Sequence, residues 1–284
     1  MRGKATAPAA GTIINALATG HGSAFAIQES ITATVELDAE QDSVSGTITE
    51  DPSADTALIE RCVSMVTDRY GGGEGGTVQT ESEIPLAAGL KSSSAAANAT
   101  ILATLSALGK ADEVDRTTAC KIGVAAARDV GVTITGAFDD ASASMLGGVT
   151  VTDNSSDSLL RQDTFEYDAL VWTPPERAYS ADADVDRCKQ IAPIVKTATR
   201  LAKNGQYTEA MNVNGLAYST ALQFPTEPAL EALPHVAGVS LSGTGPSVVA
   251  IGNQESLKEV KHMWDIRDGK TWLTTTQNSG AQTI

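Results

Sequence analysis

The sequence predicts an α+β protein built of two lobes. Three observations predict this class: strand-like alternation fills the first 50 residues, helical periodicity dominates the middle of the chain, and strands alternate with helices in the second half. A polar, turn-forming segment, Asp153–Asp157, separates the two regions. We therefore expect one domain over residues 1–160 and a second over residues 161–284.

The first lobe is expected to begin with an antiparallel sheet and to continue with helices. Alternation of apolar and polar residues predicts strands at Gly22–Ile27, Ile31–Leu37, Ser43–Thr49 and Thr77–Ile84. Helical spacing of apolar residues predicts helices at Ala54–Tyr70, Ser92–Gly109, Ala111–Val130 and Ala137–Leu146. A strand over residues 147–153 completes this lobe.

The second lobe shows the same two periodicities in a different order. Strands are predicted at Ala169–Thr173, Gly238–Leu241, Ser247–Ile251 and Thr271–Thr275. Helices are predicted at Asp184–Lys203, Thr208–Gln223 and Gln254–Ile266.

Composition excludes several classes of function. The mean hydropathy of −0.08 and the lack of an apolar run of about 18 residues argue against a membrane protein. The N-terminus lacks the apolar core of a signal peptide, so we expect a cytoplasmic protein. A net charge of −15 repels nucleic acids and is typical of adaptation to concentrated salt, which predicts a halophilic protein. The three cysteines are far apart and fit buried thiols rather than a zinc site.

The strongest local signal is a serine-rich turn that leads from a strand into a helix. Glycine permits close backbone approach, the serines open the helix, and the first free amides of that helix attract phosphate. The expected ATP-binding residues are Pro85, Leu86, Ala87, Ala88, Gly89, Leu90, Lys91, Ser92, Ser93, Ser94 and Ala95. The alternative is that the serines merely cap a core helix. Leu90 stands where a Walker A loop needs glycine, so this is a different phosphate loop.

Three segments in order resemble the motifs of the GHMP kinases. The serine-rich turn, with lysine where these families usually carry glycine, is similar to the form found in archaeal shikimate kinases. Residues 7–15 (APAAGTIIN) resemble the first motif, and residues 241–247 (LSGTGPS) resemble the glycine-rich third motif. The resemblance implies a GHMP kinase fold, with a ribosomal-protein-like N-terminal domain and a ferredoxin-like C-terminal domain. It also implies substrate-binding residues Gly11, Thr12 and Asn15, and a third-motif turn of Ser242, Gly243, Thr244 and Gly245.

An acidic pair follows in the segment TGAFDDA, which also resembles the archaeal shikimate kinases. A similar stretch of the mevalonate kinases, S-G-x-D-N, carries an aspartate beside the acceptor hydroxyl, and Asp139 is its best match here, with one extra residue after Gly136. This resemblance gives Asp139 the role of orienting and deprotonating the acceptor hydroxyl, with Asp140 as the alternate. The pair would otherwise cap the helix that follows. ATP and Mg²⁺ are the implied cofactors, with Ser93 and Asp129 as metal ligands.

Basic groups are harder to assign. Mevalonate-type relatives carry a lysine in the first motif beside the catalytic aspartate, and the nearest lysine here is Lys4. The substrate carboxylate needs a basic partner, for which Arg128, Arg177 and Arg187 are candidates.

The implied reaction is phosphorylation of the 3-hydroxyl of shikimate by ATP, a step toward chorismate and the aromatic amino acids. Two alternatives stay open: a homoserine or mevalonate-like GHMP kinase, and a non-catalytic sensor of the same fold. ATP and shikimate are the expected partners, without nucleic acid or membrane, and a homodimer is left open.

Overall fold

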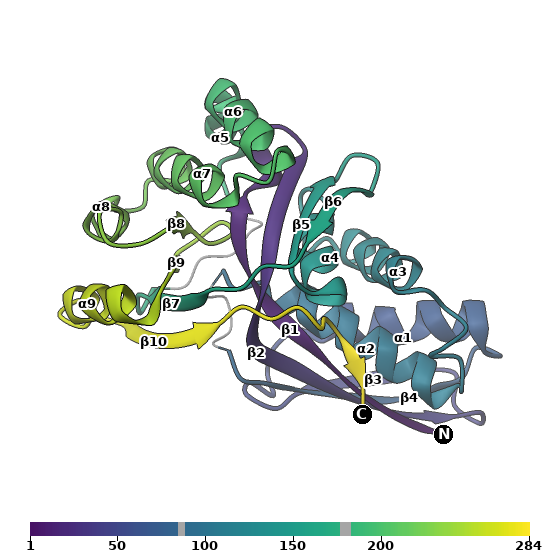
Figure 1. Cartoon of the computed structure of the whole chain (residues 1–284). Coiled ribbons are helices and arrows are strands. Elements are labelled where there is room, and N and C mark those ends of the chain that lie inside the picture. The colour runs from purple at the N-terminus through teal and green to yellow at the C-terminus, as the bar shows by residue number, and fades with distance from the viewer. Residues whose placement is uncertain (85–88, 177–182) are drawn as a thin grey trace.

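Two β-sheets organise the protein in a computed structural model that describes residues 1–84, 89–176 and 183–284 (Figure 1). A seven-stranded sheet is formed by the first part of the chain and its last strand, and a four-stranded sheet by the second part. Helices pack on both sheets, so the architecture is α+β as the sequence predicts.

The large sheet is built on a long antiparallel hairpin. It joins β1 (Arg2–Ile14) to β2 (His21–Asp38). One half of β2 pairs with β4 (Gly75–Ser82) and the other with β5 (Val149–Asp153). The outer strands are β3 (Val44–Ile48), β6 (Ser158–Asp163) and β11 (Gln282–Thr283). The long hairpin therefore joins both ends of the sheet.

One helix of the first lobe, α2 (Ser92–Ala107), is buried between the other helices and the long hairpin. The other helices are α1 (Ala57–Tyr70), α3 (Arg116–Asp129) and α4 (Phe138–Leu146). Small side chains let α2 lie close to the hairpin: a Cβ added at Gly3 of β1 would collide with the carbonyl oxygen of Ala103. Ala95 and every residue from Ala97 to Leu105 are buried, so close packing fixes the position of α2.

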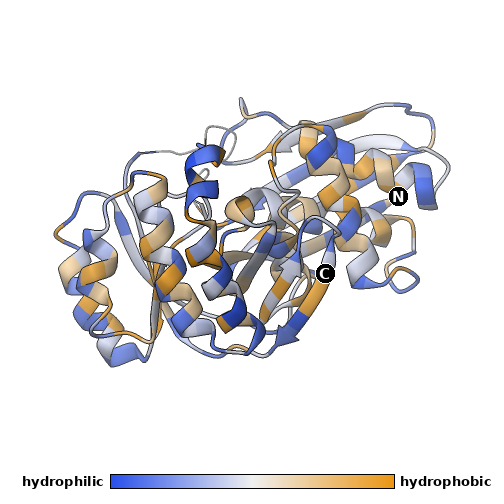
Figure 2. Cartoon of the chain, turned by 90° about the horizontal axis from the view of Figure 1, so that it is seen from above, coloured by the Kyte–Doolittle hydropathy of each residue, from blue (hydrophilic) through white to orange (hydrophobic). Residues whose placement is uncertain are grey.

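The second lobe is an antiparallel sheet with helices around it. Its strands are β7 (Asp168–Thr173), β8 (Gly238–Leu241), β9 (Val248–Gly252) and β10 (Lys270–Thr275), in the order β10-β7-β9-β8. Its helices are α5 (Val185–Gln190), α6 (Ala192–Lys203), α7 (Tyr207–Ala221), α8 (Glu227–Ala232) and α9 (Gln254–Trp264). Figure 2 shows outer helices with both hydrophilic and hydrophobic residues. In α9, Leu257, Val260 and Trp264 form the buried face.

Several elements differ from the sequence-based expectation. The first motif lies in β1 and the two expected strands between Gly22 and Leu37 are one strand, while β3 pairs with β4 in parallel. The strands β6 and β11, the helix α8 and the short 3-10 helix at Ala16–Ala18 were not expected. These elements are only two to six residues long, which is too short for a clear periodicity.

The final residues return to the first lobe. The strand β11 pairs with β1, and Ala281 donates its backbone N–H to the carbonyl oxygen of Met145 at 3.0 Å. The chain therefore crosses between the lobes twice, once before the first strand of the second sheet and once after its last strand. Among the described residues, the helices are too short or too polar to span a membrane.

Candidate active site

The three motifs meet at one place through direct hydrogen bonds. The backbone N–H of Gly243 donates to the Thr12 hydroxyl at 2.8 Å, which joins the third motif to the first. The Ser242 hydroxyl donates to the carbonyl oxygen of Gly89 at 2.8 Å. The backbone N–H of Ala10 donates to the carbonyl oxygen of Leu90 at 3.2 Å. The serine-rich turn is therefore held from both sides by segments that are far away in the sequence.

Glycine is required where the turn touches the third motif. Gly89 has φ +73°, and a Cβ there would lie 2.5 Å from the carbonyl oxygen of Ser242 and 2.7 Å from that of Gly245. Lys91 also adopts a left-handed conformation, with φ 64°, directly before α2. Its side chain makes no capping hydrogen bond, so the amides of the first turn of α2 keep their capacity to bind an anion.

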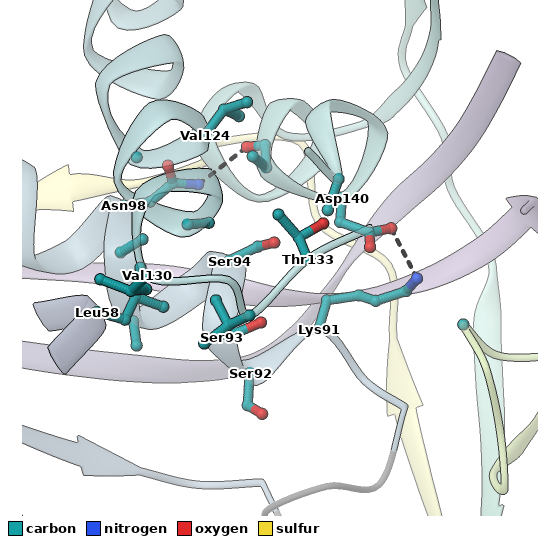
Figure 3. Close-up of a pocket in the computed structure, with 18 of the residues that line it drawn as sticks. Leu58, Lys91, Ser92, Ser93, Ser94, Asn98, Val124, Val130, Thr133 and Asp140 are labelled. Carbon is teal, nitrogen blue, oxygen red and sulfur yellow. Dashed lines mark hydrogen bonds and ion pairs between the residues drawn. The ribbon is translucent and has the colours of Figure 1, made fainter. Parts of the chain in front are cut away.

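A cavity of about 710 Å³ opens in front of this turn. Lys91, Ser92, Ser93 and Ser94 line its polar part, together with residues of the first and third motifs. Leu58 and Val130 belong to an apolar part near α1 and the end of α3 (Figure 3). A cavity of this size, with a phosphate-binding helix start beside an apolar wall, suits a nucleotide.

The acidic pair lies in the first turn of α4, and both residues line the cavity. A carboxylate oxygen of Asp140 is 2.7 Å from Lys91 Nζ, and both side chains are mostly buried (Figure 3). Burial raises the pKa of Asp140 to about 7, the charge of Asp139 adds to the rise, and Lys91 opposes it. The pKa of Asp140 therefore lies well above the ordinary value of a carboxyl group.

Asp139 is turned toward a different partner. Its side chain accepts a hydrogen bond from Asn154 Nδ2 at 2.7 Å, and it is 3% exposed. A Cβ added at Gly22 would collide with this carboxylate, so β2 packs directly against it. The two neighbouring aspartates thus have separate surroundings, one beside the serine-rich turn and one beside the turn that precedes β6.

Two of the basic candidates, Lys4 and Arg128, are not among the residues that line the cavity. Lys4 is an exposed residue of β1 paired with Thr34, so the lysine beside the acidic pair is Lys91. The signal was present in the sequence, because lysine replaces the usual glycine of the turn. The side chain of Arg128 binds both carboxylate oxygens of Asp157 at 2.7 Å.

The remaining candidates are placed as follows. Asn15, Gly243 and Thr244 line the cavity, whereas Gly11 packs on the ring of Phe25 and Thr12 is buried behind the third motif. Arg187 donates through Nε to the carbonyl oxygen of Ala221 at 2.8 Å. The candidates Pro85, Leu86, Ala87, Ala88 and Arg177 lie outside the described residues.

The residues present fit a magnesium ion in part. Serine hydroxyls stand at the phosphate-binding turn, and magnesium in kinase sites commonly takes one or two protein ligands beside phosphate oxygens. Asp129, the other expected ligand, is half-exposed and pairs with Arg61 at 2.7 Å, apart from the cavity. Within the described ranges, no three acidic, histidine or cysteine side chains form a metal-binding group.

Comparison with known proteins defines the class of the fold. A family profile described as GHMP kinases N terminal domain matches residues 57–148. A homoserine kinase structure from Cytophaga hutchinsonii superposes with a TM-score of 0.76 at 18% identity, covering 100% of this chain and 97% of that one. The structure of the mevalonate kinase of Methanococcus jannaschii superposes with a TM-score of 0.71 at 15% identity, covering 98% of each chain. The fold is that of the GHMP kinases.

Full-length relatives narrow the class further. The shikimate kinase of Halobacterium salinarum is 62% identical over 283 residues, covering 100% of both chains. That of Methanosarcina mazei is 49% identical, covering 99% of this chain and 96% of the relative. The chain therefore belongs to the archaeal shikimate kinases of the GHMP kinase superfamily.

Proposed function

We propose that the protein transfers the γ-phosphate of ATP to the 3-hydroxyl of shikimate, giving shikimate 3-phosphate for the synthesis of chorismate and the aromatic amino acids. Membership in the family of archaeal shikimate kinases supports shikimate as the substrate. The observation that carries the chemistry is the Lys91–Asp140 contact at 2.7 Å, which brings an acidic side chain to the start of the phosphate-binding helix. A proton acceptor and a phosphoryl donor site thereby share one cavity.

The triphosphate would lie at the start of α2, with adenine toward the apolar part of the cavity. The free amides and the hydroxyls of Ser92, Ser93 and Ser94 supply donors, and Lys91 supplies positive charge. Phosphoryl transfer depends mainly on positioning and on neutralising charge, so contacts that hold Gly89 and Leu90 in place suit the reaction. Magnesium, held by Ser93 and phosphate oxygens, would neutralise part of the phosphate charge. The position of Asp129 on the surface favours a site that does not use its carboxylate.

The geometry favours Asp140 over Asp139 as the proton acceptor. The reacting hydroxyl must lie between the γ-phosphate and its base, and Asp140 is the member of the pair that contacts the phosphate turn. A carboxyl group with a pKa near 7 also accepts protons efficiently at neutral pH. Asp139, the residue favoured by the sequence, would instead hold a hydroxyl of the acceptor as a fixed hydrogen-bond acceptor.

A coupled assay for ADP release tests this proposal. The purified protein is offered shikimate, homoserine and mevalonate in turn, and turnover is expected with shikimate. Turnover with homoserine or mevalonate instead would overturn the assignment of shikimate as the substrate. Nucleotide binding without turnover of any of the three compounds would indicate a sensor. Light scattering of the active species decides whether it is a homodimer.

Paired variants test the acidic residues. Asp140→Asn should lower kcat by about 10²-fold or more, because no side chain then accepts the proton, while ATP still binds. Asp139→Asn should mainly raise KM for shikimate. A large fall in kcat for Asp139→Asn, with Asp140→Asn nearly normal, would return the role of base to Asp139.

A further inference from the structure

The turn between β5 and β6 contains a buried amide that the sequence does not single out. Asn154 lies in this turn and is 2% exposed. Its backbone N–H donates to the carbonyl oxygen of Gly20 at 2.8 Å, which ties the turn to the segment that follows the first motif. A buried amide side chain needs partners for both ends.

The side chain of Asn154 bridges two buried groups. Its Oδ1 accepts a hydrogen bond from the Thr152 hydroxyl at 2.7 Å, and its Nδ2 donates to the carboxylate of Asp139 at 2.7 Å. An ionised carboxylate can only accept, so the NH₂ end of the amide must face Asp139. The Thr152 hydroxyl, which can donate as well as accept, then donates to the other end of the amide.

Arg128 braces the turn from outside. Its guanidinium donates to both oxygens of Asp157, and also to the carbonyl oxygen of Asn154 at 3.2 Å. It also packs against Gly136, just before the acidic pair, where an added Cβ would collide with the guanidinium. One arginine therefore contacts both the turn that carries Asn154 and the loop that leads into α4.

We propose that Asn154 is a positioning residue of the acceptor site, which holds the Asp139 carboxylate in one orientation against β2. The proposal rests on the proposed function, because it gives Asp139 a role toward the acceptor. With Gly22 on one side and Asn154 on the other, the carboxylate is confined, and one oxygen is engaged by the amide. Asn154 itself is absent from the cavity wall, so it acts through Asp139 rather than on the substrate.

The test is a double-mutant cycle on kcat/KM for shikimate. Asn154→Ala removes the donor and should lower kcat/KM about 10- to 100-fold, as expected for a lost hydrogen bond to a charged group. In an Asp139→Asn background the same change should cost less than about twofold, because the group it positions is already altered. Binding of a fluorescent ATP analogue should be unchanged in all variants.

A second variant keeps the test independent of folding. Asn154→Leu has nearly the same shape, but it offers no donor to Asp139, so its loss of kcat/KM should match that of Asn154→Ala. Asn253→Ala is the matched control: that asparagine caps α9 by accepting from the N–H of Ser256 at 2.9 Å, and its loss should leave kcat/KM unchanged.

Each outcome decides the proposal. Equal losses in the two backgrounds would show a merely structural role for Asn154, and normal activity of Asn154→Leu would also overturn the inference. An unmodified protein that fails to phosphorylate shikimate would refute the proposed function instead. The two failures are therefore distinguishable.

Discussion

Replacing Lys91 with methionine tests the electrostatics of the site most directly. The change removes an ammonium 2.7 Å from the Asp140 carboxylate and keeps much of the side-chain volume. Burial and the charge of Asp139 raise the pKa of Asp140 and Lys91 opposes the rise, so that the pKa is about 7 with all three present. Without the lysine, the pKa should therefore rise further, by about 1–3 units for the loss of an adjacent opposite charge.

The expected effect on activity follows from the fraction of Asp140 that is ionised. At pH 7.5 a group with a pKa of about 7 is roughly three-quarters ionised, whereas a rise of about two units leaves roughly 3% ionised. This alone predicts a fall in kcat of roughly 25-fold at pH 7.5, recovered as the pH is raised. Lys91→Arg keeps the charge and is the control.

The assay is the pH dependence of kcat at saturating ATP and shikimate, measured by coupled ADP release. Saturation removes the separate effect of Lys91 on nucleotide affinity. The acidic limb of the profile should move to higher pH in Lys91→Met and stay in place in Lys91→Arg. An acidic limb at the same pH in both variants, or a loss that is equal at every pH, would refute the reasoning.

Three further predictions follow from the structure. Gly89→Ala should lower the free energy of unfolding by about 2–4 kcal/mol, because the added Cβ meets two carbonyl oxygens. Urea denaturation measures this loss, and a loss below about 0.5 kcal/mol would contradict the close packing. Relative to the unmodified protein, Asp140→Asn should gain stability as the pH rises through about 7, because the raised pKa means that the stability contributed by the Asp140 carboxyl is fully present below its unfolded pKa and is lost as the pH rises through its folded pKa. Thermal unfolding from pH 5 to 9 tests this, and a gain that is equal at all pH values would contradict it. Raising KCl from about 0.1 M to 2 M should increase Tm, because salt screens the repulsion of a net charge of −15; an unchanged Tm would count against adaptation to salt.

Local patterns predicted the helices well and the edges of the sheets poorly. The span Ser92–Ala107 is rich in alanine and other small residues, begins after a glycine turn and stops just before Gly109, so its helix was recognisable from the sequence. Within the strand-like first 50 residues no separate strand was assigned at β1, because its residues from Ala7 to Ile14 are buried on both faces and interrupt the alternation. Short elements such as α8 depend on tertiary packing for their stability.

The site was predicted in its motifs but not in its contacts. Lys91 and Asp140 were both singled out, yet their pairing joins the start of α2 to the start of α4 and depends on how the two helices pack. Asn154 stood in a segment that composition classes as a turn, and nothing local distinguishes an amide that faces solvent from one that faces a buried carboxylate. Those contacts are a property of the tertiary structure.

The two crossings between the lobes have a mechanical consequence. They run beside each other and are bonded together: the N–H of Phe165 donates to Asn278 Oδ1 at 2.9 Å, and the N–H of Thr276 donates to the carbonyl oxygen of Tyr167 at 3.0 Å. A paired tether resists twisting far better than a single flexible linker, since rotation would have to break these bonds. Substrate entry and product exit should therefore rely on movements of individual loops around a stiff frame, rather than on a swing of one half against the other.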